Sequence, residues 1–417
     1  MDRASRILWV TDEPPDRTLG GGSIRQAHLL EALAQAFPTD LLTAGARPEE
    51  RVRELVEDVT ELPRRTAPWT EHPVGRRALS LAIALGSRDP SPVYPTRSVR
   101  RDLAKEIDRR RGHYALVCVE HEALAPVIPE LRGERWILTF HNLLSGMIES
   151  ELEPAPGRRQ RWFRERDLAK ATALERRALS RYDRCVVCSD EDAAALSEIA
   201  GPGTSARFSV VPNGVDLEAL RPTPLPAEPR ILLPGHLAWQ PNVDGAVWFC
   251  AEVWELVRAA VPNATLMLVG REPAPEVLAL ERVPGVSVHA NVPSMAAYFE
   301  SARAVVVPLK VGTGTRLKAL EGMAAGRPVI GTAVGLGGIG AVHRVHALFA
   351  EDPESFASAV TEALRRDELA ESLARNGRDY VVERFGWDRI GREFVTTVSE
   401  LLGGEVRPAI RASSSDA

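Results

Sequence analysis

Long apolar runs are missing from this sequence. Across its 417 residues, no apolar segment approaches the roughly 20 residues that a helix needs to span a bilayer. The start of the chain also lacks the apolar core of a signal peptide, because Asp2, Arg3 and Arg6 interrupt it. These absences argue against a membrane-spanning or secreted protein, and we expect a cytoplasmic one.

Cysteine is scarce. The four cysteines, Cys118, Cys185, Cys188 and Cys250, are too few and too scattered for a disulfide framework. Cys185 and Cys188 form a C-x-x-C, but no second such pair is present, and the two valines between them are typical of a strand. We therefore expect buried thiols rather than a zinc or redox site.

The sequence also lacks an excess of charge of one sign. Its 52 basic and 57 acidic side chains leave a formal charge of -5, so no global positive field attracts nucleic acid. We expect no nucleic-acid partner. Hydrophobic residues make up 44% of the chain and charged residues 26%, which is the composition of a globular protein.

Strand-like and helix-like segments alternate along the chain. Residues 6–11 (RILWVT) are followed by Gly20, Gly21 and Gly22 and then by a helical pattern that runs through Leu33. Further strand-like segments with amphipathic stretches between several of them are residues 115–119, 136–140, 184–188 and 208–211. This order predicts an α/β domain with a parallel sheet, which we place at residues 1–216.

A second α/β domain is predicted after a proline-rich linker. The chain is too long for one core, and residues 217–229 hold prolines that stiffen the path between domains. The second domain, residues 230–386, has strand-like segments at 231–234, 264–269, 286–289, 304–308 and 328–332 and a helix at 243–261. A last helix is expected at 387–402, and a disordered tail at 403–417.

The segment 305–331 carries the clearest signs of a binding site. A strand leads into a loop with Gly312 and Gly314, and Thr315 is placed to cap a helix that begins near Arg316. Glycines allow a ligand close to the backbone, and the free N–H groups of a helix start suit phosphate. Arg316 and Lys318 add positive charge.

Glu321 lies on or beside the apolar face of this helix. A carboxylate in such a place needs hydrogen-bond donors, because burying it alone costs several kcal/mol. The hydroxyl groups of a ligand, such as those of a ribose, are one source of donors. A salt bridge to a nearby arginine inside the protein is the other, and the residues alone leave both open.

Three segments resemble one family. They are VVPNGVD at residues 210–216, ILLPGHLAWQPNVDGAVWF at 231–249 and VPLKVGTGTRLKALEGMAAGRPVIGT at 307–332. Together they are similar to the retaining glycosyltransferases of family 4, and the likeness covers nearly the whole chain. The resemblance implies the GT-B fold, in which two Rossmann-like domains face each other across a cleft and a C-terminal helix crosses back to the N-terminal domain.

The resemblance also implies roles for single residues. The second domain would bind a nucleotide sugar, with Glu321 on its ribose, and His141 in TFHN would lie near the reacting sugar. We assign catalytic roles to His141, Arg316, Lys318 and Glu321. The expected donor contacts are Gly21, Gly22, Gly235, His236, Asn242, Arg271, Val292, Gly312, Thr313, Gly314, Thr315, Arg316, Leu317 and Glu321.

The sequence departs from the family pattern in two places. Thr313 stands where the family often has the first of two glutamates, and His236 and Asn242 stand where arginine and lysine are common. The positive charge that would meet the donor diphosphate is therefore missing from its usual position. We predict that Arg316 and Lys318 supply it, because a leaving nucleotide needs its developing charge stabilised.

The reaction implied is transfer of a sugar with retention, to a polysaccharide, a lipid-linked glycan or a small-molecule glycoside. A nucleotide-sugar epimerase and a catalytically weak nucleotide-sugar-binding protein are the alternatives. We expect no cofactor and no required metal. The sequence Asp190-Glu191-Asp192 is similar to a metal-binding D-x-D, but Ser189 ahead of it is typical of a helix cap.

An arginine-rich stretch begins at Arg158 and ends at Arg184, with Trp162 and Phe163 among its charges. Such a stretch is usually a solvated helix face with acidic neighbours. The alternative is peripheral contact with the anionic inner face of a membrane, which would suit a lipid-linked acceptor. The oligomeric state stays open.

Overall fold

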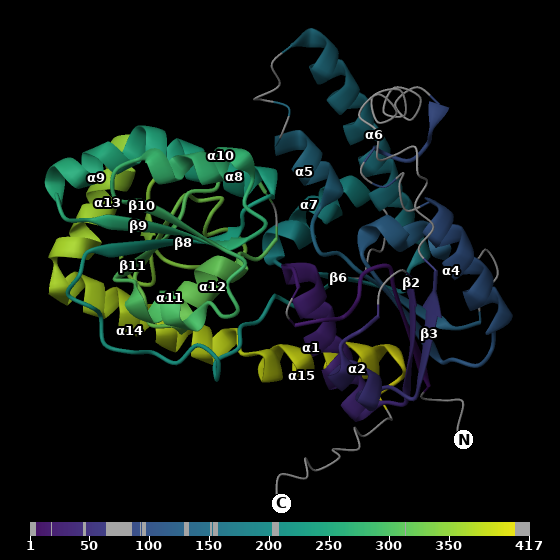
Figure 1. Cartoon of the computed structure of the whole chain (residues 1–417). Helices are drawn as coiled ribbons and strands as arrows, with labels where there is room; N and C mark the ends of the chain where they lie inside the picture. The colour runs from purple at the N-terminus through teal and green to yellow at the C-terminus, as the bar shows by residue number, and fades with distance from the viewer. Residues whose placement is uncertain are drawn as a thin grey trace, which may run out of the picture. The chain divides into compact units, whose positions relative to one another are not determined.

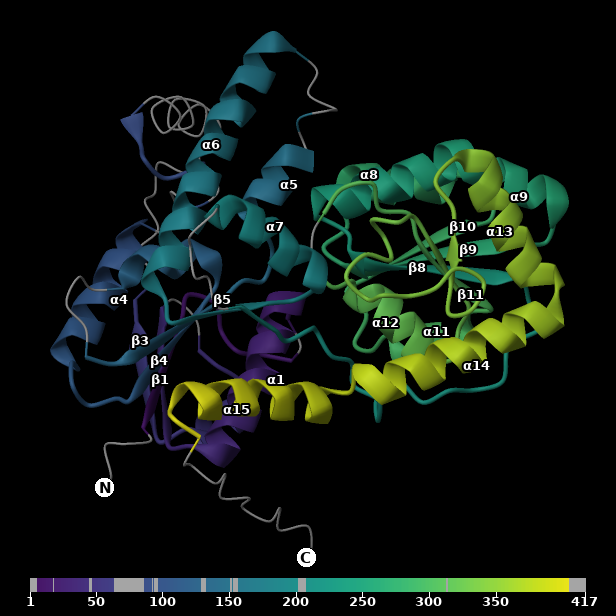
Figure 2. The same ribbon diagram turned by 180° about the vertical axis from the view of Figure 1, so that it is seen from behind.

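The chain forms two compact units. The computed structural model describes residues 6–17, 19–44, 47–63, 86–91, 93, 97–128, 133–150, 152, 157–201, 208–312 and 314–404. The first unit comprises Met1–Val211 with Ile390–Ala417, and the second comprises Pro212–Arg389. Both are α/β units, as the alternation of segments predicts (Figures 1 and 2).

The first unit is built on a seven-stranded sheet in the order β3-β2-β1-β4-β5-β6-β7. All of its neighbouring strands are parallel. The strands are β1 Ile7–Thr11, β2 Thr39–Ala44, β3 Asp58–Leu62, β4 Leu116–Glu120, β5 Arg135–Thr139, β6 Arg184–Val187 and β7 Phe208–Val210. The helices are α1 Gly21–Ala36, α2 Glu50–Leu55, α4 Arg97–Arg109, η3 Glu122–Val127, α5 Leu144–Ser150, α6 Arg158–Arg181 and α7 Asp190–Ala200.

Both faces of this sheet are covered. Every residue of β1 is buried. On one face of the strand, Leu8 and Val10 pack in the core cluster that also includes Leu103 of α4. Trp9 points to the other face and meets Phe394 of the last helix, α15 Trp387–Leu401, edge to face with ring centroids 5.9 Å apart. Strands that are buried on both faces appear as continuous apolar runs, which is why the sequence predicts β1, β4, β5 and β6 well.

The second unit holds a six-stranded sheet in the order β10-β9-β8-β11-β12-β13, again with parallel neighbours. The strands are β8 Arg230–His236, β9 Thr265–Arg271, β10 Val286–Ala290, β11 Ala304–Val307, β12 Val329–Gly331 and β13 Leu348–Phe349. The helices are α8 Gln240–Trp248, α9 Trp254–Ala260, α10 Pro275–Leu278, η5 Ala279–Arg282, α11 Ala296–Ser301, α12 Leu317–Ala324, α13 Pro353–Arg365 and α14 Asp367–Arg384. Separate core clusters lie on the two faces of the sheet.

The helix predicted at residues 243–261 starts earlier and is interrupted. It begins at Gln240, and a π-helical segment, Phe249–Val253, joins α8 to α9. Pro241 fits the first turn, where a missing N–H costs no hydrogen bond. Among the described residues, no helix is long and apolar enough to cross a membrane.

The proline-rich stretch 217–229 belongs to the second unit and is held there by arginines. The fully buried Arg327 donates from Nη2 to the carbonyl oxygen of Thr223 at 2.6 Å and from Nη1 to that of Pro224 at 3.3 Å. Arg303 donates to the carbonyl oxygen of Pro226 at 2.9 Å. Burial lowers the pKa of Arg327 to about 10, so the hydrogen bonds must offset a loss of hydration.

We expect Arg327→Met to lower the free energy of unfolding by about 2–4 kcal/mol, because it leaves several carbonyl groups without donors. Urea unfolding followed by circular dichroism measures the change. The matched control is Arg375→Met, since Arg375 is exposed in the same unit. Equal urea midpoints for the two variants would show that the arginine contacts do not hold this segment.

Candidate functional site

One group of polar residues gathers at the carboxyl ends of β8 and β11. The turn at residues 308–316 follows β11 and leads into α12, and Gly235 lies near the end of β8. In open parallel sheets, ligands bind beyond this edge. The sequence prediction for segment 305–331 therefore falls at a suitable place in the second unit.

The turn depends on two glycines. Gly312 has φ 136° and Gly314 has φ 78°. Residues that carry a side chain rarely adopt a positive φ of this size. A Cβ atom at Gly312 would also lie 2.8 Å from Nη2 of Arg316. Arg316 is buried and donates from Nε to the carbonyl oxygen of Val334 at 2.9 Å, which fixes its guanidinium group beside the turn.

The predicted cap of α12 is wrong. The N-cap residue is Arg316 rather than Thr315, and no side chain caps the helix, which starts at Leu317. Arg316 is extended, with φ -86° and ψ 92°, so the helical conformation begins one residue later than expected. Thr315 is buried, and its carbonyl oxygen accepts from Nδ2 of Asn213 at 3.3 Å. Thr313 lies outside the described residues.

Lys318 brings a cation to the end of β8. Its Nζ atom donates to Oδ1 of Asn242 at 2.5 Å, and Nδ2 of Asn242 donates to the carbonyl oxygen of His236 at 2.8 Å. A Cβ atom on Gly235 would lie 2.9 Å from Nδ2 of Asn242 and 3.0 Å from Nζ of Lys318. Only a glycine at position 235 leaves room for this contact.

The carboxylate of Glu321 is paired with no other residue that the structure describes. Among the residues that the structure describes, no hydrogen bond or ion pair reaches its carboxylate, which stays partly exposed. Burial raises the pKa of Glu321 to about 7, and the charge of Lys318 opposes this rise. Burial, and after it the charge of Arg316, lowers the pKa of Lys318 to about 7. The internal salt bridge that the sequence left open is absent from this part of the chain.

A second group of polar residues gathers in the first unit, at the carboxyl ends of β4 and β5. His141 follows β5 and is buried, and its Nε2 atom lies 2.9 Å from Oε2 of Glu120. Its backbone N–H donates to Oε2 of Glu122 at 3.3 Å. A Cβ atom on Gly22 would lie 3.0 Å from Nδ1 of His141, so the start of α1 reaches the same place.

The residues that surround His141 were missed by the sequence analysis. Glu120 ends β4, and His121 and Glu122 follow it directly. The sequence VEHE at the end of a buried strand was the available signal. The ring of His121 lies 5.5 Å from that of His141 between centroids, and its φ of 84° marks a strained turn. Burial acts to lower the pKa of His121, but nearby carboxylates, Glu122 and Asp12 foremost, outweigh it and raise the pKa.

Family models match both units. The model described as "Glycosyltransferase Family 4" matches residues 19–219, and the model described as "Glycosyl transferases group 1" matches residues 228–366. The chain belongs to the group 1 glycosyltransferases of family 4. It is therefore an enzyme that transfers a sugar from a nucleotide-sugar donor, and neither the epimerase nor the catalytically weak nucleotide-sugar-binding protein is favoured.

Solved structures show that this glycosyltransferase has the GT-B fold. Sucrose-phosphate synthase from Thermosynechococcus elongatus is 20% identical, with a TM-score of 0.67 over 96% of this chain and 100% of that chain. HepE of Anabaena, solved with UDP-glucose, is 13% identical, with a TM-score of 0.63 over 95% and 100%. The trehalose-6-phosphate synthase OtsA is 14% identical, with a TM-score of 0.65 over 97% and 100%. No curated protein sequence gives a match.

The other residues predicted to contact the donor form no side-chain hydrogen bond or ion pair with Lys318 or Glu321 in the described part of the chain. His236 is exposed, and its Nε2 atom lies 3.1 Å from Oε2 of Glu272. Arg271 ends β9 and pairs with His236 in strand register. Val292 is partly buried and packs on the core cluster that contains Leu320. Gly21 starts α1, which has no side-chain cap.

The other predictions about acidic residues and cysteines can also be compared with the structure. Ser189 caps α7, because its Oγ atom accepts from the N–H of Asp192 at 3.1 Å, as predicted. All four cysteines are buried and free, also as predicted. Burial raises the pKa of the Cys185 thiol to about 12. In the described part of the chain, no group of His, Cys, Asp and Glu residues could hold a metal ion.

The lowered pKa of Lys318 predicts a pH-dependent gain in stability for Lys318→Met without ligand. In the unfolded chain this lysine takes up its proton below its usual pKa of 10.5, but in the folded chain only below about 7. Folding therefore works against the charged lysine at low pH, and the penalty disappears as the pH rises from about 7 to 10.5. Thermal melting should show that Lys318→Met is more stable than the wild type near pH 6 and close to it near pH 10.

The matched control for this experiment is Lys310→Met, because Lys310 is exposed in the same unit. It should show no such dependence on pH. The raised pKa of Glu321 acts in the opposite sense between pH 4.5 and about 7, so each comparison is made with the wild type at the same pH. A gain for Lys318→Met that is equal at both pH values would contradict the assignment.

Proposed function

We propose that the second unit binds the nucleotide of the donor at the turn 308–316 and at the start of α12. Lys318 and Arg316 meet the diphosphate, and Glu321 accepts hydrogen bonds from the ribose hydroxyl groups. The contact of Lys318 with Asn242 carries this proposal, since it puts an ammonium group at the end of β8. Position 242 is where the family resemblance led us to expect a basic residue, so α12 supplies the missing charge.

Two further observations support this donor site. No side chain caps α12, so the N–H groups of its first turn can meet a phosphate oxygen. The carboxylate of Glu321 has no partner in the described part of the chain, although burial disfavours its charge. A ligand hydroxyl group would supply the missing hydrogen bond. The similar HepE structure holds UDP-glucose, which supports a nucleoside diphosphate sugar as the donor here.

The proposed chemistry is transfer with retention, driven by charge stabilisation and orientation. As the bond between the anomeric carbon and the diphosphate oxygen breaks, negative charge grows on the leaving diphosphate. This charge raises the pKa of Lys318, so the lysine is held protonated when its charge is needed. Because Lys318 and Arg316 supply this charge, we propose that the reaction requires no metal.

We propose that the first unit binds the acceptor and places His141 beside the reacting sugar. A carboxylate only accepts hydrogen bonds, so an ionised Glu120 fixes the proton of His141 on Nε2. The Nδ1 atom is then the one that faces Gly22. The surrounding carboxylates can accept hydrogen bonds from sugar hydroxyl groups and favour positive charge that develops on the sugar ring.

Lys318→Gln should weaken binding of a nucleoside diphosphate by roughly tenfold or more, and binding of the matching nucleoside much less. The reason is that Lys318 meets the diphosphate and not the ribose. A thermal-shift screen first identifies the base, and calorimetry then gives both affinities. Glu321→Gln should weaken binding of the nucleoside and of the nucleoside diphosphate alike. The neutral control is Arg375→Gln, because Arg375 is an exposed cation of the same unit that lies outside the turn and outside α12. If Lys318→Gln lowered the affinity for the nucleoside and for the nucleoside diphosphate equally, Lys318 would not be the residue that meets the diphosphate.

Glu120→Gln should lower the turnover number by roughly 10- to 100-fold and leave nucleoside diphosphate affinity unchanged. The glutamine amide can donate to Nε2 of His141 and so removes the fixed tautomer. The pH profile of turnover should change shape as well, which a purely structural effect would not produce. Glu54→Gln, an exposed change in the same unit, is the control. An unchanged turnover number in Glu120→Gln would show that Glu120 does not position His141 for the reaction.

A further inference from the structure

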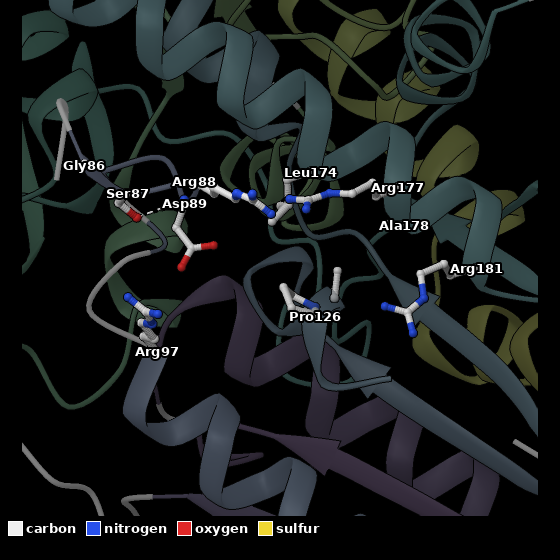
Figure 3. Close-up of a pocket in the computed structure, with 11 residues that line it drawn as sticks. Gly86, Ser87, Arg88, Asp89, Arg97, Pro126, Leu174, Arg177, Ala178 and Arg181 are labelled. Carbon is white, nitrogen blue, oxygen red and sulfur yellow. Dashed lines mark hydrogen bonds between the residues drawn. The ribbon is translucent and has the colours of Figure 1, made fainter. Parts of the chain in front are cut away.

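A pocket lies within the first unit, and arginines form part of its lining. Its volume is about 430 Å³, and its walls come from the chain ahead of α4, from η3 and from the last turns of α6. Arg88, Arg97, Arg177 and Arg181 line it (Figure 3). Arg97 and Arg181 lie on opposite sides of Pro126 in this view. The donor residues and His141 do not belong to this lining.

The positive charge of this pocket is not balanced by its own lining. Asp89 is the one acidic residue among the lining residues described, and it is bound by Arg100, with Nη2 and Oδ2 2.5 Å apart. The guanidinium groups of Arg88, Arg97 and Arg177 have no hydrogen bond or ion pair with other described residues. Four like charges around one cavity repel each other, and an anion in the cavity would relieve this repulsion.

Arg181 is held in a fixed position. Its Nη2 atom donates to the carbonyl oxygen of Ile128 at 3.0 Å, which fixes the position of the guanidinium group. A planar guanidinium presents two parallel donors that match the oxygen atoms of a phosphate group. The overall charge of the protein is -5, so the positive potential is a property of this pocket and not of the whole chain.

Part of the pocket lining is apolar. Leu174 and Ala178 of α6 and Ala125 of η3 are buried, and Pro126 is exposed beside them. The pocket therefore combines cationic side chains with an apolar surface, and its volume is in the range of small-molecule sites. A ligand that fits both parts has an anionic group and a less polar remainder.

We propose that this pocket binds a phosphate-bearing ligand. Arg88, Arg97, Arg177 and Arg181 hold the phosphate group, and the rest of the ligand packs on Pro126 and Leu174. The ligand is either a soluble phosphorylated small molecule or the phosphate headgroup of a lipid. This site is separate from the proposed donor site, so it does not depend on the assignment of Lys318 or Glu321.

The test compares the double variant Arg97→Gln/Arg177→Gln with Arg101→Gln/Arg158→Gln. Both variants lose two exposed arginines, one from α4 and one from α6, but Arg101 and Arg158 lie outside the pocket lining. Calorimetry with phenyl phosphate and with inorganic phosphate measures affinity at fixed ionic strength. We expect phenyl phosphate to bind the wild type and the control variant with equal affinity. Its affinity for the pocket variant should be lower by roughly tenfold or more.

Vesicle sedimentation separates the two sources of phosphate. Vesicles of phosphatidylcholine alone are compared with vesicles that also contain phosphatidic acid. Loss of phosphatidic acid binding in the pocket variant alone assigns a lipid headgroup, and loss of phenyl phosphate binding without any vesicle binding assigns a soluble ligand. Equal affinities of the two variants for every probe would overturn the proposal. Single variants, Arg97→Gln and Arg177→Gln, give the same test if the double variant does not fold.

Discussion

The contact between Lys318 and Asn242 is the interaction on which the proposed donor site depends. It brings an ammonium group from the start of α12 to the end of β8, where burial opposes its charge and lowers its pKa to about 7. The contact is possible because Gly235 has no side chain and because Asn242 is itself bound to the carbonyl oxygen of His236. A charge that is poorly hydrated before the ligand arrives interacts strongly with a phosphate when it does.

In the first unit, a histidine and two glutamates form the corresponding group of polar side chains. His141, Glu120 and Glu122 stand at the carboxyl ends of two neighbouring parallel strands, and the start of α1 approaches them at Gly22. Parallel strands bring their carboxyl ends to one edge, so residues that directly follow different strands meet there. In both units a glycine makes room for a polar side chain that a larger residue would displace.

The sequence predicted most strands but missed three, for physical reasons. In β2, the buried Asp40 interrupts the apolar pattern, and only the folded chain shows that Arg6 and the hydroxyl group of Tyr114 bind its carboxylate. Strand β3 lies at the edge of its sheet and has only exposed and half-buried residues, with no regular alternation. Strand β13 has only two residues, Leu348 and Phe349, which is too short for any periodicity to appear.

The sequence by itself determined the α/β class, the family, the positions of the glycines in the turn after β11 and some of the residues of the candidate site, but not those around His141. Those features are local, because apolar runs and glycines act within a few residues of the chain. Only the tertiary structure decided that Lys318 meets Asn242, that no described residue pairs with the carboxylate of Glu321 and that Glu120 holds His141. These contacts join segments that are distant along the chain. Periodicity tells which side of an element is buried, but not which atoms lie within hydrogen-bonding distance once the strands are ordered in a sheet.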